Sequence, residues 1–155
     1  MSIQEYMIKT KKTLALAESC TGGRMAAELT REPGASLYFL GSLVVYSNEL
    51  KSSLLQVPSK LIEEKGAVSE EVVEAMLSGL FRITRADYGI AVTGIAGPTG
   101  ASAGKPVGTV YAAFGERGKA PRLHSLFIKG EREEMMSQTA THLLELFYAF
   151  LKNPI

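Results

Sequence analysis

The stretch "LALAESCTGGRMAA", residues 14 to 27, combines an apolar run, a tight polar elbow and the beginning of a helix. Its first part, with "TLALA" at 13 to 17, predicts a buried strand. Gly22 and Gly23 then interrupt the pattern, and the alanines, methionine and leucine of "RMAAELTRE" favour a helix that ends at Pro33. A strand that turns directly into a helix indicates a layered α/β protein.

The rest of the chain repeats this alternation. Further strands are predicted at "SLVVYS" (42–47, read as buried), "YGIAV" (88–92), "VGTVYAAF" (107–114) and "RLHSLFI" (122–128). Further helices are predicted at 2–11, at 48–55 with Asn48 as N-cap, at 59–66 closed by Gly66, at 69–87 capped by Ser69, and over about twenty residues from Glu131. The last two strands form a predicted hairpin. We therefore expect a three-layer α/β/α sandwich with a five-stranded mixed, mostly parallel sheet.

Composition narrows the class of protein. The 155 residues are 46% hydrophobic and 21% charged with a net charge of +1, which predicts a single globular domain over 1–155 and no nucleic-acid partner. The chain has one cysteine and therefore no internal disulfide. Its charged N-terminus is unlike a signal peptide, and "SLYFLGSLVVYS" is shorter than the roughly 20 residues of a membrane span. These features predict a cytoplasmic protein without a membrane partner.

The elbow carries two adjacent candidate nucleophiles, Ser19 and Cys20. A strand that enters a helix through such a turn exposes backbone N–H groups and the positive end of the helix dipole, which suit a phosphate or a reaction oxyanion. The alternative is that the glycines only make a tight turn. The elbow does not follow the nucleophile-elbow motif, since Ala17 and Thr21 stand where that motif has glycine.

A second glycine-rich loop, "TGIAGPTGASAGKPVG", occupies residues 93–108. The loop does not match the P-loop motif, because Thr99 stands where that motif has its first glycine and Pro106 where it has Ser or Thr. Its glycine spacing also differs from that of dinucleotide-binding proteins. Both unusual loops follow strands of the parallel part of the sheet, and ligands of open α/β sheets bind beyond the carboxyl ends of such strands. We expect the two loops to face one ligand.

A serine nucleophile needs a base. His124 and His142 lie in a strand and a helix pattern and are predicted to be structural, and no cluster has the spacing of metal ligands. Lysine is the natural substitute, provided that burial or a nearby cation lowers its pKa. Lys51 stands out because it follows a strand end.

Four blocks taken together resemble a known family. They are "AESCTGG" (17–23), "VVYSNELK" (44–51), "GAVSEEVVEAM" (66–76) and "TGIAGPTG...KPVGTVY" (93–111). In order and spacing they are similar to the C-terminal domain of the competence/damage-inducible CinA proteins, whose stand-alone members are nicotinamide-nucleotide amidohydrolases. The resemblance runs from about residue 13 to residue 150.

This resemblance implies an α/β/α domain that hydrolyses the carboxamide of nicotinamide mononucleotide (NMN) to nicotinic acid mononucleotide and ammonia, as a homodimer without metal or other cofactor. Matched position by position, Ser19 is the expected nucleophile, Lys51 its base and Tyr46 a hydroxyl that assists the pair. The Cys20 thiol is expected to take no part in the reaction, and Cys20 contributes mainly a backbone N–H group to the elbow. The residues expected to bind substrate or oxyanion are Cys20, Thr21, Gly22, Gly23, Asn48, Thr93, Gly94, Gly97 and Arg132.

The chain departs from the family pattern at Ser42, where glycine is usual, at Met136, where arginine is usual, and in the run Thr99–Ala101. Two alternatives therefore stay open beside the amidohydrolase of NMN. One is a nucleotide-binding module that has lost catalysis, and the other is an amidase for a different small amide.

Overall fold

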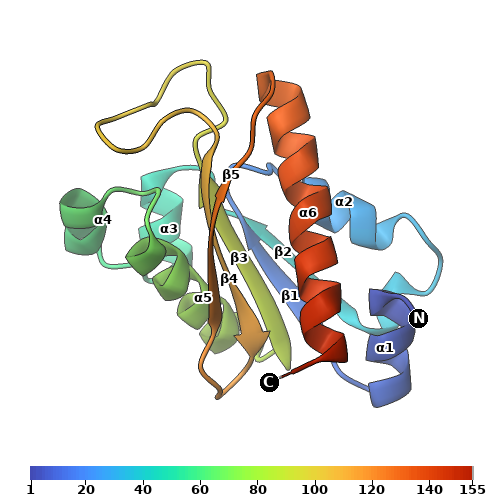
Figure 1. The fold of residues 1–155 in the computed structure, drawn as a ribbon. Helices are drawn as coiled ribbons and strands as arrows, with labels where there is room; N and C mark the ends of the chain where they lie inside the picture. Colours follow the sequence, from blue (N-terminus) through green and yellow to red (C-terminus); the bar gives the residue numbers. More distant parts are fainter. Residues whose placement is uncertain (155) are drawn as a thin grey trace.

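A five-stranded sheet forms the middle layer of the computed structural model, which describes residues 1–154; Ile155, the last residue of the predicted domain, lies outside them. The sheet order is β2-β1-β3-β4-β5 (Figure 1). The strands are β1 (Leu14–Glu18), β2 (Phe39–Val44), β3 (Tyr88–Gly94), β4 (Thr109–Glu116) and β5 (Arg122–Phe127). β2 and β3 run parallel to β1, whereas β4 is antiparallel to both β3 and β5. The predicted mixed, mostly parallel sheet with its late hairpin is confirmed.

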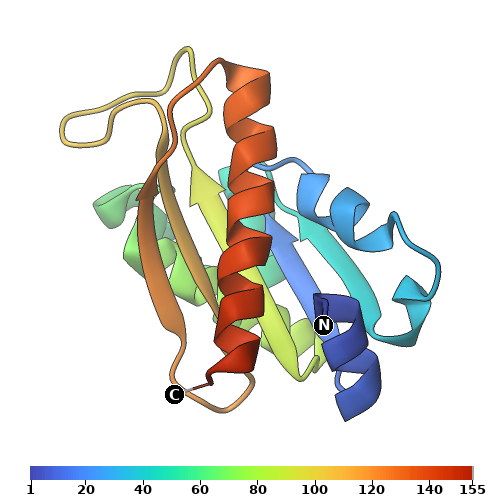
Figure 2. The ribbon, with the colours of Figure 1, turned by 45° about the vertical axis from the view of Figure 1, so that its right-hand side comes forward.

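Helices cover both faces of this sheet (Figures 1 and 2). One face carries α1 (Ile3–Thr10), α2 (Arg24–Thr30) and α6 (Arg132–Lys152), and the other carries α3 (Asn48–Leu55), α4 (Ser59–Lys65) and α5 (Glu70–Thr84); a 3-10 turn, η1, spans Ala35–Leu37. Successive side chains of a strand point to opposite faces, so Leu14 and Leu16 join the first core while Ala15 and Ala17 join the second. The three-layer α/β/α prediction is confirmed.

Serine side chains cap the first turns of α1, α3 and α5. At α1, the Ser2 hydroxyl accepts from the Glu5 N–H while the Glu5 carboxylate accepts from the Ser2 N–H, a reciprocal capping box. Ser69 caps α5 as predicted. The predicted cap of α3 was wrong by one residue: Ser47, not Asn48, has the extended backbone of an N-cap, and its hydroxyl accepts from the Leu50 N–H.

The strand β2 differs most from the sequence prediction. It spans Phe39–Val44 instead of 42–47, and none of its residues is buried. β2 pairs only with β1 and lies at the edge of the sheet, so its side chains are covered on fewer sides than those of a central strand. The register shifts past Leu40, a bulge that lets Gly41 stay within the strand, and the chain leaves the sheet just after Val44.

The longest helix, α6, has 21 residues and packs along the sheet through a stripe that includes Leu143 and Phe147. Among residues 1–154, neither this helix nor any other combines the length and the apolar character that crossing a lipid bilayer requires.

Candidate functional site

A cavity of about 190 Å³ lies beyond the carboxyl ends of β1, β2 and β3. Its walls come from the segments that follow these three strands and from the approach to α5. The lining residues are Ser19, Cys20, Tyr46, Asn48, Lys51, Ala67, Val68, Thr93, Gly94 and Ala96. The elbow and the glycine-rich loop thus face one cavity, at the place where ligands of open α/β sheets bind.

Ser19 and Lys51 meet inside this cavity. The Lys51 Nζ atom lies 3.0 Å from Ser19 Oγ, although 32 positions separate the two residues in the chain. The same nitrogen donates to the backbone carbonyls of Val45, at 3.1 Å, and Tyr46, at 3.2 Å. Both side chains are buried, with 6% of Ser19 and 2% of Lys51 exposed.

The surroundings of Lys51 favour its neutral form. Burial lowers the pKa of the Lys51 amine, and the nearby Cys20 opposes this only in part. A neutral amine has two N–H donors and one lone pair. The two carbonyls of Val45 and Tyr46 can take both donors, which leaves the lone pair for the Ser19 hydroxyl proton. The arrangement can therefore activate a serine without a histidine.

Cys20, the neighbouring candidate nucleophile, is not prepared for catalysis. Burial raises the pKa of its thiol to about 12, so the reactive thiolate is disfavoured at neutral pH. Its sulfur packs against Gly94, where an added Cβ would lie 2.9 Å from Sγ. Cys20 fills space between the elbow and β3.

Tyr46 lines the cavity and is bridged to Gly97 by Arg132; neither Gly97 nor Arg132 lines the cavity itself. One Arg132 nitrogen, Nη2, donates to the Tyr46 hydroxyl at 2.8 Å, and the other, Nη1, donates to the Gly97 carbonyl at 2.7 Å. The Tyr46 hydroxyl is therefore bonded to Arg132, whereas its backbone carbonyl contacts Lys51. The bridge links the segments that follow β2 and β3 to the start of α6.

The elbow differs in one respect from the expected anion site. The N–H groups of Met25 and Ala26, in the first turn of α2, donate to the buried carboxylate of Glu18 and do not face the cavity. Within residues 1–154, no acceptor on another residue receives the N–H groups of Cys20, Thr21 and Gly23. Of these three residues only Cys20 lines the cavity, so its N–H group, next to Ser19, is the available donor for a reaction oxyanion.

The other predicted site residues divide into two groups. Asn48, Thr93 and Gly94 line the cavity, and the Thr93 hydroxyl donates to the Ala67 carbonyl. Thr21 does not line it. Gly22 and Gly23 do not line it either. They adopt positive φ angles of 56° and 94°, and so they make the turn into α2.

Sequence reasoning missed several residues that the structure brings to the site. Ala67 and Val68, which precede α5, line the cavity; they belong to the block "GAVSEEVVEAM", but neither was predicted as a site residue. The Ser42 hydroxyl donates to the carboxylate of Glu18, the residue before Ser19, at 2.7 Å. The signal for Glu18 was a charged residue that ends an otherwise apolar strand.

Both histidines lie outside the site. His124 stacks on Phe114 with ring centroids 4.8 Å apart, and His142 lies 3.9 Å from Glu145 on α6. Among residues 1–154, no group of three or more His, Cys, Asp or Glu side chains is placed to hold a metal ion.

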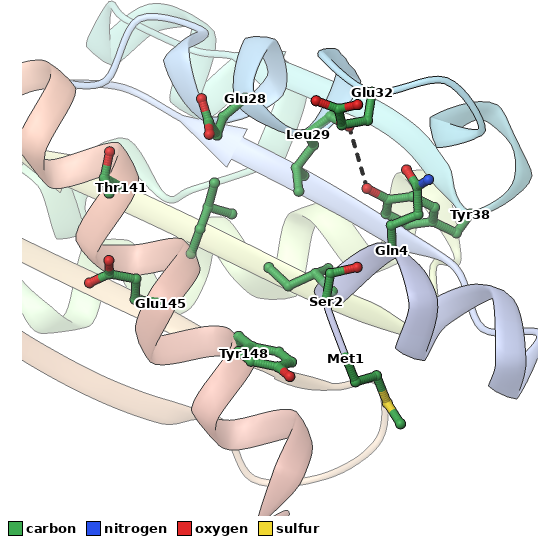
Figure 3. Close-up of a pocket in the computed structure, with 12 residues that line it drawn as sticks. Met1, Ser2, Gln4, Glu28, Leu29, Glu32, Tyr38, Thr141, Glu145 and Tyr148 are labelled. Atoms are coloured by element: carbon green, nitrogen blue, oxygen red, sulfur yellow. Dashed lines mark hydrogen bonds between the residues drawn. The ribbon is translucent and has the colours of Figure 1, made fainter.

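A larger groove of about 540 Å³ lies elsewhere, between α1, α2 and α6 (Figure 3). Leu29 and Tyr38 line it, and carboxylates such as Glu28 and Glu145 line it as well. None of the predicted site residues contributes to this groove. Size alone therefore does not locate the chemistry of this protein.

Comparison with known proteins gives a consistent match. The family model described as "CinA C-terminal domain" matches residues 1–151. A CinA-like protein of Desulfotalea psychrophila is 44% identical over 153 residues, which are 99% of this chain and 37% of the relative. A CinA-like protein of Geotalea uraniireducens is 51% identical over 128 residues, 82% of this chain and 30% of the relative. The chain thus spans little more than a third of the length of such relatives.

Solved structures of similar length share the fold. The competence damage-inducible protein A (ComA) of Klebsiella pneumoniae superposes with a TM-score of 0.92 at 33% identity, covering 96% of this chain and 92% of that one. The competence/damage inducible protein CihA of Agrobacterium tumefaciens gives a TM-score of 0.92 at 35% identity, with 97% and 92% covered.

Proposed function

Because this chain belongs to the CinA C-terminal domain family, we propose that it is an amidohydrolase that converts NMN and water to nicotinic acid mononucleotide and ammonia. The observation that carries the proposal is the 3.0 Å contact between Lys51 Nζ and Ser19 Oγ in a buried cavity. The choice of NMN as substrate rests on the family resemblance of the four sequence blocks.

The acylation step uses the Ser19–Lys51 pair. The neutral Lys51 amine takes the Ser19 hydroxyl proton as the oxygen attacks the carboxamide carbon. The N–H group of Cys20 stabilises the oxyanion that forms. The Lys51 ammonium then gives its proton to the departing nitrogen, the C–N bond breaks, and ammonia leaves an ester on Ser19.

Deacylation repeats the chemistry with water. Lys51, neutral again, takes a proton from a water molecule that attacks the ester, and returns it to the Ser19 oxygen as the ester bond breaks. The products are the carboxylic acid and the free serine. Over both steps one amide and one water are consumed, and no oxidant or reductant is needed.

The volume of the cavity suits one part of NMN, the ring that carries the carboxamide. Its volume of about 190 Å³ is below the roughly 300–1,000 Å³ of pockets that enclose whole small molecules. A carboxamide-bearing ring fills such a cavity, and the ribose phosphate of the nucleotide extends over its mouth. Arg132, bonded to the cavity residue Tyr46, would offer the phosphate a positive charge there.

Incubation of the purified protein with NMN, with and without a chelator, tests the proposal by measuring ammonia release. We expect release in both conditions, its loss in Ser19→Ala, and near-full activity in Cys20→Ser. Full activity in Ser19→Ala would show that Ser19 is not the nucleophile. Tight NMN binding without turnover in the wild type would favour a binding module, and ammonia release only from other amides would favour a different amidase.

We also propose, from the same family resemblance, that the protein is a homodimer in the cytoplasm. Light scattering coupled to size-exclusion chromatography measures the mass in solution directly. A mass near twice the 16.7 kDa of the chain is expected, and a mass of one chain at the concentrations of the activity assay would contradict the dimer.

A further inference from the structure

The carboxylate of Glu18 is fully buried at the end of β1, one residue before Ser19. Its Oε1 accepts from the Thr21 hydroxyl at 2.7 Å and from the Met25 N–H at 2.9 Å. Its Oε2 accepts from the Ser42 hydroxyl at 2.7 Å and from the Ala26 N–H at 3.2 Å. Four donors thus surround one carboxylate, and such complete pairing is what makes a buried carboxylate tolerable.

These contacts replace a missing helix cap. The N-cap of α2 is Gly23, which has no side chain to accept from the first turn of the helix. Glu18 reaches across from β1 and takes the N–H groups of Met25 and Ala26. The elbow that contains Ser19 lies between Glu18 and α2. Hydrogen bonds from the first turn of α2 to the Glu18 carboxylate therefore hold the two ends of this elbow together.

Hydrogen bonds also connect the backbone of Glu18 to Lys51, the proposed base, through Val45. Its carbonyl accepts from the Val45 N–H at 2.8 Å. The Val45 carbonyl in turn accepts from Lys51 Nζ, which contacts Ser19 Oγ. A closed ring of covalent and hydrogen bonds runs from Glu18 through Ser19, Lys51 and Val45 back to Glu18, and Ser42 ties the Glu18 side chain to the neighbouring strand β2.

From this ring we infer that Glu18, held by Ser42, is a positioning residue that sets the Ser19 oxygen and the adjacent Cys20 N–H group against Lys51 without touching the substrate. The inference rests on the proposed function, because it concerns the same Ser19–Lys51 pair. A carboxylate with four donors and no contact to the cavity acts on the reaction only through the geometry of its neighbours. Its loss should lower kcat and leave KM nearly unchanged.

Two variants and one control test this role. Glu18→Gln keeps the shape of the side chain and replaces one acceptor oxygen by a donor, which breaks part of the cluster. Ser42→Ala keeps the carboxylate and its three other donors. Ser125→Ala is the matched control, because Ser125 is an exposed serine on β5, the opposite edge strand of the sheet.

The measurements are kcat and KM for ammonia release from NMN, and the titration midpoint of Lys51 by NMR of protein labelled with ¹³C on lysine. For Glu18→Gln we expect kcat to fall by about tenfold to a hundredfold, with KM within about twofold of the wild type. Ser42→Ala should lower kcat less and move the Lys51 midpoint toward the ordinary lysine value, because a loosened elbow admits water. Ser125→Ala should change neither quantity.

A Glu18→Gln protein that melts at a lower temperature but keeps its kcat and its Lys51 midpoint would make Glu18 merely structural and overturn the inference. If Glu18→Gln does not fold, Ser42→Ala decides, and an unchanged kcat and midpoint in that variant overturn it. If the wild type releases no ammonia from NMN, the proposed function fails. The Lys51 midpoint in the variants needs no substrate and then decides the positioning role alone.

Discussion

The Lys51 amine is buried beside Ser19, and its burial determines how the activity should depend on pH. Burial lowers the pKa of the amine below the ordinary value of 10.5, so the neutral, basic form becomes available at a lower pH than for a surface lysine. The rate of ammonia release should therefore rise with pH along an acid limb with its midpoint below 10.5. A pH–rate profile of kcat/KM measures this midpoint. A profile that falls as pH rises through this range would contradict a neutral Lys51 base.

The same argument predicts that arginine cannot replace Lys51. A guanidinium stays protonated at any accessible pH, so Lys51→Arg replaces the proposed neutral base by a permanent positive charge. We expect kcat to fall at least about a hundredfold. The matched control is Lys60→Arg, at an exposed position on α4, which should keep wild-type kcat. Equal activity of both variants would remove Lys51 from the mechanism.

Cys20 offers a third prediction at the scale of one residue. Burial raises the pKa of the Cys20 thiol to about 12, so the thiol stays protonated at pH 8. The native protein should resist Ellman's reagent, and the urea-unfolded protein should react with one equivalent. As a control, Ser78→Cys in a Cys20→Ser background places a thiol on the exposed face of α5 and should react at once. Rapid labelling of native wild-type protein would mean that Cys20 is accessible.

The packing of α5 on α3 depends on a glycine. A Cβ added at Gly79 would lie 2.0 Å from the carbonyl oxygen of Leu55, and this oxygen also accepts from Arg82. Alanine is the better helix former by about 1 kcal/mol, but Gly79→Ala would force the two helices apart. We expect a net loss of about 1–3 kcal/mol in the free energy of unfolding. Urea denaturation measures it, with Ser78→Ala on the exposed face as the control within about 0.5 kcal/mol of the wild type. Two curves that coincide would show that α5 packs differently.

The strands and helices that sequence reasoning placed well are those whose signals are local. Ser69 precedes an apolar stripe of 3.6-residue period, and "YGIAV" is a short apolar run bounded by polar residues, so both elements could be predicted from neighbouring residues alone. The first and last residues of β2 could not be predicted from neighbouring residues. They depend on its place at the sheet edge and on the bulge past Leu40, which are properties of the pairing with β1.

At the scale of the whole molecule, the site is made of segments far apart in the chain. The Ser19–Lys51 pair was predicted because four blocks resemble a family, and the parallel strands then bring the two residues within 3.0 Å. The cluster of Glu18 with Ser42 could not be predicted in this way. It joins residues 24 positions apart through contacts that exist only once β1 and β2 have paired.

Because the Arg132 bridge connects the segments after β2 and β3 to α6, a ligand held there should stabilise the molecule as a whole. Within residues 1–154 the Arg132 guanidinium takes part in no ion pair and bonds only to the uncharged oxygens of Tyr46 and Gly97, so it is free to attract a phosphate. In a Ser19→Ala background, in which we expect no turnover, NMN at a hundred times its Kd should add about 2.7 kcal/mol to the free energy of unfolding. For a chain of this length that corresponds to a rise in Tm of about 5–10 °C.

Differential scanning calorimetry with NMN and with nicotinamide riboside, which lacks the phosphate, separates the two parts of the ligand. At a matched concentration, the riboside should raise Tm less than NMN does, and Arg132→Gln in the Ser19→Ala background should reduce the NMN effect to that of the riboside. If Arg132→Gln leaves the NMN effect intact, the phosphate is held elsewhere, and the donors of the elbow or of the glycine-rich loop must take it. If NMN at millimolar concentration raises Tm in neither variant, the cavity beside Ser19 belongs to a different amide.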